Sequence, residues 1–208
     1  FWGFDNTQIS NLTAGVYASA VFALIVAPMV GKKFGKKRGA ISIGILAFTI
    51  APMPVILRLL GLLPPNGSPE LFQFILFVTI FDVGLIIATQ MLMGSMVADI
   101  VEDSELQTGR RSEGIYFAGI SFIRKLSQGA GVMTASLVLA VAGFAKGGGG
   151  AGATEESIRL LGWGYAISLL VAWSLMILCV SFYRISRESH AENLRSLSAR
   201  DEASKVRD

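Results

Sequence analysis

Two adjacent cations interrupt a long apolar run in the stretch SFIRKLSQG, residues 121–129. A helix that begins near residue 114 would place Lys125 about 11 residues, or roughly 16 Å, along its axis, near the middle of a bilayer. A charge at that depth is costly and faces a cavity or a partner, unless the side chain reaches back to the interface. Ser121, Lys125 and Gln128 share a helix face at spacings of four and three, which favours a polar cavity lining. Arg124 lies about 100° around the helix from Lys125, so its role is open.

One acidic residue lies at a comparable depth in a different apolar segment. Asp82 is about 11 residues from the outer end of its predicted helix, which again places it near mid-membrane. Thr79, Thr89 and Gln90 form an approximate polar stripe with it. This pattern predicts that Asp82 and Gln90 contribute to the same cavity as Lys125. The alternative is a structural ion pair.

A second charged region follows directly after that segment. Asp99, Glu102 and Glu105 have helical spacing, and Arg111 and Glu113 precede the next apolar run. One interpretation is a solvated helix end. The other is a gate in which the carboxylates pair with arginine in one state and release it in another.

The composition indicates that membrane helices position these residues. The 208 residues are 52% hydrophobic and 16% charged, with a mean hydropathy of +0.59, whereas soluble domains carry about 25% charged residues. A helix needs about 20 apolar residues to cross a bilayer, and five segments have that length: 9–30, 40–63, 71–97, 114–144 and 158–183. We therefore predict an all-α, polytopic membrane helix bundle with five transmembrane helices in residues 1–183.

The basic residues predict the orientation of this bundle. Thirteen of the 18 Lys and Arg residues fall in the loop 31–39, at 110–111 and in the tail 184–208, and three fall in the opposite connections. Cytoplasmic loops of membrane proteins carry such an excess, so the tail is predicted to be cytoplasmic in a bacterial inner membrane. The pI of 9.2 then reflects topology and gives no case for nucleic-acid binding. In the loop 31–39, Gly35 is predicted to supply a tight turn.

The sequence holds no pattern typical of an enzyme. It lacks a nucleophile–base arrangement, a metal-ligand cluster, a dinucleotide-binding glycine fingerprint and a phosphate-binding loop. The single cysteine, Cys179, lies in an apolar run and is expected to pack there. We expect no catalysis, no metal site and no cofactor.

Five crossings is an odd number, and the chain begins with the aromatic residues Phe1, Trp2 and Phe4, which suit an outer membrane interface. We expect the chain to be a piece of a longer protein in which another helix precedes it. Six helices are one half of a transporter built from two six-helix repeats.

The motifs MVADIVED at 96–103 and RSEGI at 111–115, followed by Lys125, resemble the glycoside–pentoside–hexuronide:cation symporter family of the major facilitator superfamily. The resemblance covers the whole chain as helices eight to twelve of twelve. It implies cation-coupled symport of a sugar or glycoside by alternating access, with Na⁺ or H⁺ as the coupling ion. Its other implied partners are a small-molecule substrate, the bilayer and the N-terminal half, where the family's cation-binding acids lie.

The resemblance also implies roles for individual residues. Asp99 and Glu102 match acidic positions of the family's cytoplasmic gating network, Arg111 matches their basic partner, and Lys125 matches a lysine near the central cation and sugar sites. The matching helix has Gln90 and no Trp, whereas melibiose-type members use an aromatic residue near the sugar in that helix, which argues against galactoside specificity. The alternatives are a carrier of lysolipids or other amphiphiles in the same superfamily, and a membrane scaffold without transport.

Overall fold

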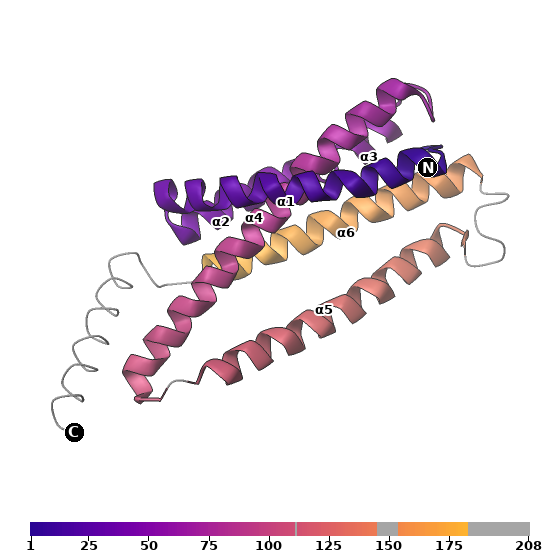
Figure 1. Cartoon of the computed structure of the whole chain (residues 1–208). Coiled ribbons are helices and arrows are strands. Elements are labelled where there is room, and N and C mark those ends of the chain that lie inside the picture. The colour runs from indigo at the N-terminus through magenta and orange to yellow at the C-terminus, as the bar shows by residue number, and fades with distance from the viewer. Residues whose placement is uncertain (111, 145–153, 183–208) are drawn as a thin grey trace, which may run out of the picture.

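The structure is a computed structural model that describes residues 1–110, 112–144 and 154–182, and its elements in these ranges are all α-helices (Figure 1). The predicted all-α class is confirmed. Arg111 and the predicted tail 184–208 lie outside the described residues. The helices are α1 (Asn6–Phe34), α2 (Lys36–Ile50), α3 (Met53–Leu59), α4 (Pro69–Thr108), α5 (Glu113–Val141) and α6 (Glu155–Ser181).

Four of the described segments are long and apolar enough to cross a membrane, which confirms the helical membrane bundle. They are α1, α2 together with α3, α4 and α6. The helix α5 has 29 residues, enough for about 43 Å, but the polar stretch 121–129 lies at its middle and it is not one of the four. A crossing by α5 therefore remains a prediction.

Local side-chain chemistry sets where several helices begin. Asp5 and Gln8 form a reciprocal capping box at the start of α1, with the Gln8 backbone N–H donating to Asp5 Oδ1 at 2.7 Å. The hydroxyl of Ser68 accepts from the backbone N–H of Leu71 at the start of α4, and Thr154 caps α6 in the same way. These side chains satisfy backbone donors that a helix start leaves without partners.

Several helix boundaries differ from the apolar segments. The helices α1 and α2 extend into the predicted loop 31–39 and leave only Gly35 between them. The segment expected as one helix over 40–63 is divided between α2 and α3, because Pro52 has no N–H to donate and its ring obstructs the preceding turn. The helix α4 runs for 40 residues, or about 60 Å, so it is too long for a bilayer core and must project beyond it. Its end at Gly109, with φ of 70°, adopts the left-handed conformation that glycine favours.

Small residues let the helices of the bundle approach closely. The core joins α1, α2, α4 and α6, and its smallest members are Ala23, Ala27, Ala40, Ala47 and Ala88. Such residues are typical of helix contacts in membranes, where van der Waals packing drives association.

The helix α5 lies apart from this bundle (Figure 1). None of its residues is buried, and its main contacts are with α6 and, to a lesser extent, with α4. Val138 marks the contact with α6, where it lies against Gly164. The fold therefore presents most of α5 without a partner from the described chain.

Candidate functional site

The basic segment 31–39 and the acidic segment that begins at Asp99 meet at one end of the bundle. Asp99 is buried on α4, with a side chain 4% exposed, and it accepts a 2.5 Å hydrogen bond from Lys36 Nζ at the start of α2. Lys36 Nζ also lies 3.5 Å from the carbonyl oxygen of Ser95, one turn earlier on α4. The pair thus fixes the start of α2 against the last third of α4.

The neighbouring lysine makes a parallel connection to a different helix. Lys37 Nζ donates to the carbonyl oxygen of Ser181 at 2.9 Å, at the last residue of α6. A cation is favourable there because the carbonyl groups at a helix end carry partial negative charge. Lys36 and Lys37 therefore tie α4 and α6 to the same turn.

Glycines make that turn possible. Gly35 has φ of 79° and ψ of 165°, a conformation that residues with a Cβ rarely adopt, which confirms the predicted turn. Leu92 of α4 packs against Gly31 and Gly39, and a Cβ at either position would lie 3.1–3.3 Å from its methyl groups. The end of α1 and the start of α2 can approach α4 this closely only because Gly31 and Gly39 have no side chains.

The other residues predicted for the gate are placed less closely together. Glu102 is partly buried one turn after Asp99, and Glu113 is exposed at the start of α5. Arg111, the expected basic partner, lies outside the described residues, so its pairing stays a prediction. The structure thus places Asp99 and Glu102 on successive turns of α4, with Lys36 as a partner of Asp99, and the gating role of these residues stays a prediction.

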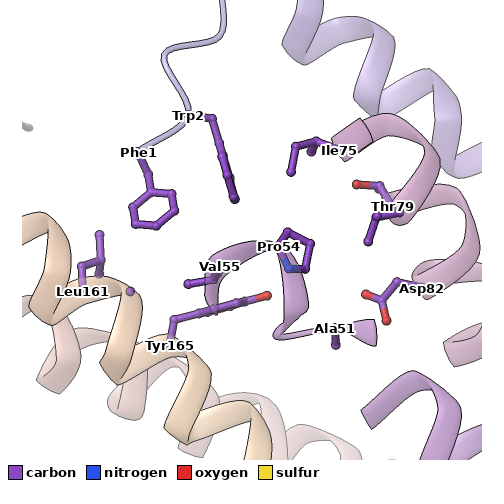
Figure 2. A pocket seen from close by; sticks show the side chains of 12 residues that line it. Phe1, Trp2, Ala51, Pro54, Val55, Ile75, Thr79, Asp82, Leu161 and Tyr165 are labelled. Carbon is purple, nitrogen blue, oxygen red and sulfur yellow. The ribbon is translucent and has the colours of Figure 1, made fainter. Parts of the chain in front are cut away.

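Asp82 lines a pocket between α4, the α2–α3 break and α6, with a cavity volume of about 460 Å³ (Figure 2). Ile75, Val78, Thr79 and Asp82 form one face of α4 in this pocket, at helical spacing. The opposite wall is formed by residues of α6 and of the break, and Phe1 and Trp2 complete it. Figure 2 shows the Asp82 carboxylate and the Tyr165 hydroxyl both directed into this space.

The predicted polar stripe on α4 is divided in the structure. Thr79 and Asp82 line the pocket, whereas Thr89 is buried and its hydroxyl donates to the carbonyl oxygen of Leu85 at 2.9 Å. Gln90 is exposed. Only the first half of the stripe thus faces a cavity.

The residues predicted on α5 form a separate group. Ser121, Arg124, Lys125 and Gln128 are all exposed on a helix with no buried residue. Within the described ranges, no ion pair joins Asp82 to Lys125, and α5 contributes nothing to the lining of the Asp82 pocket. The described residues do not form a common cavity for these two charges, and such a cavity stays a prediction.

Sequence reasoning missed several residues of these sites. Lys36 entered the prediction only as one of the basic residues that indicate orientation, and nothing in its spacing separates it from the four other cations of the segment 31–39. Tyr165 gave no signal, because a tyrosine in an apolar helix is ordinary at a membrane interface. The docking of Trp2 depends on a hydrogen bond from the Gly67 backbone N–H to the Trp2 carbonyl oxygen, at 3.0 Å, across 65 positions of sequence.

Comparison with known proteins finds a matching family model and several transporter relatives. A family model described as "MFS/sugar transport protein" matches residues 1–187. An uncharacterized symporter of Synechocystis sp. is 28% identical over 69% of this chain and 26% of its own length. The isoprimeverose transporter of Lactiplantibacillus pentosus is 21% identical over 89% of this chain and 36% of its own length.

A third relative differs in the cargo that its name gives. A candidate 2,3-dihydroxypropane-1-sulfonate exporter of Escherichia coli K12 is 30% identical over 51% of this chain and 23% of its own length. The chain thus spans between about a quarter and a little over a third of the relatives it matches. No solved structure gives a significant match to the chain.

Proposed function

The chain belongs to the MFS/sugar transport protein family, and from that premise we propose that it forms part of a secondary transporter that couples uptake of a sugar or glycoside to Na⁺ or H⁺. The symporter relatives support secondary transport, and the isoprimeverose transporter among them supports a glycoside as cargo. The expected mechanism is alternating access, with the substrate near the membrane midplane between two halves of the protein.

The observation that carries this proposal is the polar face of α5. Ser121, Lys125 and Gln128 are exposed there, on a helix that packs against its neighbours only in part. A lysine at that depth in a bilayer needs a cavity or an acidic partner. We propose that the remainder of the transporter covers this face, and that Lys125 lies at the resulting cavity beside an acidic residue that binds the coupling ion.

The charge cluster at the end of the bundle gives secondary support. A rocking transporter needs contacts that form on one side of the membrane and break during the cycle. The pair of Lys36 with Asp99 joins two segments that are 63 positions apart, which suits such a contact. We place this cluster on the cytoplasmic side and expect Glu102, Arg111 and Glu113 to extend it.

A second cargo class follows from the adjacent cations on α5. One relative is a candidate exporter of an organic sulfonate, which is an anion. Lys125, with Arg124 about 100° around the helix from it, gives α5 positive charge that could pair with a sulfonate, so an anionic organic acid is the alternative substrate.

Transport by the full-length protein in proteoliposomes tests both classes. Radiolabelled isoprimeverose and radiolabelled 2,3-dihydroxypropane-1-sulfonate would be offered separately, each under an imposed Na⁺ gradient, an H⁺ gradient or none. We expect gradient-dependent accumulation of the glycoside, and we expect Lys125→Ala to abolish it. Thr134→Val is the matched control, because residue 134 lies on the opposite face of α5.

The outcomes separate the alternatives. Accumulation of the sulfonate alone would replace the glycoside with an anionic cargo. Undiminished uptake by the Lys125→Ala protein would remove Lys125 from the coupling mechanism. Reconstituted protein that moves neither compound, nor a lysolipid, would favour the scaffold.

A further inference from the structure

The pocket at Asp82 has features that neither a sugar site nor a structural ion pair accounts for. Its volume of about 460 Å³ falls in the range of small-molecule sites, which is about 300–1,000 Å³. It lies between α4, α6 and the α2–α3 break, and α5 has no part in its lining. It is therefore distinct from the polar face on which the proposed transport function rests.

One oxygen of the Asp82 carboxylate lacks a hydrogen-bond donor in this pocket among the described residues. Its Oδ1 atom is buried and accepts no hydrogen bond from any described residue. No lysine, arginine or histidine is among the residues that line the pocket. Burial of a carboxylate oxygen without a hydrogen-bond partner is costly, so a group that supplies positive charge from outside the described chain would be bound favourably.

The remaining walls decide which positive group fits. Apart from the Trp2 indole, the polar side chains of the lining are Thr79, Asp82 and Tyr165. A sugar would leave most of its hydroxyls without partners there, and burying such groups costs free energy. A small inorganic cation prefers several oxygen ligands, whereas three side chains offer few and the cavity is much larger than an ion.

An ammonium group with an apolar body satisfies both parts of the pocket. Figure 2 shows that the Tyr165 side chain extends toward Asp82, where it can contact the cation, as aromatic side chains do in known sites for quaternary ammonium ligands. The Phe1 ring lies across the pocket beside Leu161 and offers apolar surface. Val55, Ile75 and Leu161 offer apolar surface to the rest of the molecule. We propose that this pocket binds an organic ammonium ion, with the nitrogen beside Asp82 and the hydrocarbon body among the apolar walls.

Equilibrium dialysis of the purified full-length protein tests the proposal with radiolabelled benzyltrimethylammonium. Unlabelled neopentylbenzene, which has the same shape with carbon in place of nitrogen, is the uncharged competitor. We expect saturable binding that neopentylbenzene displaces at least about tenfold less well than unlabelled benzyltrimethylammonium, because a charged contact at a buried site contributes that much. Exchange of K⁺ for Na⁺ in the buffer should leave binding unchanged.

Four variants make the test specific. Asp82→Asn should weaken binding about tenfold or more, and Asp82→Glu should retain most of it. Leu161→Trp should reduce binding by filling the cavity while the carboxylate remains. Glu70→Gln, an exposed acid on the same helix, should have no effect.

A separate readout guards against misfolded variants. The probe should raise the melting temperature of the unaltered protein and of Asp82→Glu, and should leave that of Asp82→Asn unchanged. Equal affinity for the charged and uncharged compounds, displacement by Na⁺, or full binding by Asp82→Asn would each overturn the proposal. None of these outcomes depends on whether the protein transports a glycoside.

Discussion

At the scale of single residues, the contact between Lys36 and Asp99 differs from an ordinary surface ion pair. Exposed pairs contribute about 0–1 kcal/mol, because water screens the charges and two side chains lose freedom. Here the carboxylate is 4% exposed and the lysine 33% exposed, so most of the interaction lies out of water. The stability of a buried carboxylate depends on its hydrogen-bond donors, so removing one donor lowers the free energy of unfolding of the protein.

We therefore expect Lys36→Met to destabilise the protein by about 1–3 kcal/mol, the cost of leaving a buried charged acceptor without one of its donors. Thermal unfolding in detergent would measure this as a lower melting temperature. Lys32→Met is the matched control, since Lys32 is an exposed cation of the same loop and should have little effect. The exchange Lys36→Asp with Asp99→Lys should recover part of the loss. Equal melting temperatures for the Lys36 and Lys32 variants would show that the pair contributes nothing.

The acidic member of this pair was predictable and its partner was not. Asp99 stands out in the sequence because it begins a run of carboxylates at helical spacing directly after an apolar segment. Lys36 is one of five cations in nine residues, and which of them reaches Asp99 depends on how α2 packs on α4. Local patterns carry no information about a contact over 63 positions, so the described partner emerges only from the fold.

At the scale of elements, the turn at Gly35 determines how the basic loop meets α4. The sequence predicted this turn correctly because a glycine in a short basic segment between two apolar helices is typical of a tight turn. The division of α2 from α3 was missed, although Pro52 and Pro54 were visible, because the apolar run continues on both sides of them. Hydropathy reports where the chain lies in a membrane and does not report where the helix is broken within it.

Gly35→Ala tests the turn directly. No atom lies within 4 Å of a Cβ placed there, so the expected cost is backbone strain alone, about 1–3 kcal/mol at a φ of 79°. Gly94→Ala is the matched control, because its Cβ also meets nothing and its helical backbone on α4 tolerates alanine. Alanine exceeds glycine in helix propensity by up to about 1 kcal/mol, so this variant should be neutral or more stable. A melting temperature for Gly35→Ala at or above that of Gly94→Ala would contradict the assignment.

At the scale of the whole molecule, the bundle has two chemically different ends. The helix α1 separates them by 29 residues, or about 43 Å, which exceeds the thickness of a hydrocarbon core. At its start, the Gly67 backbone N–H donates to the Trp2 carbonyl oxygen, so the aromatic residues and the 64–69 turn lie together. At its other end is the loop 31–39 with its five cations. The predicted orientation places the first end outside and the second in the cytoplasm.

Accessibility to a membrane-impermeant maleimide decides that orientation in intact cells that produce the full-length protein. In a Cys179→Ala background, Asn66→Cys should react with reagent added outside, and Lys33→Cys should react only after the membrane is permeabilised. Both positions are exposed in the structure, so a lack of reaction reports the membrane and not burial. The physical reason is the positive-inside bias, since segments rich in lysine and arginine stay on the cytoplasmic side. The reverse labelling pattern would place Lys36 and Asp99 outside, and a gate built on them would then close the outer entrance of the proposed transporter.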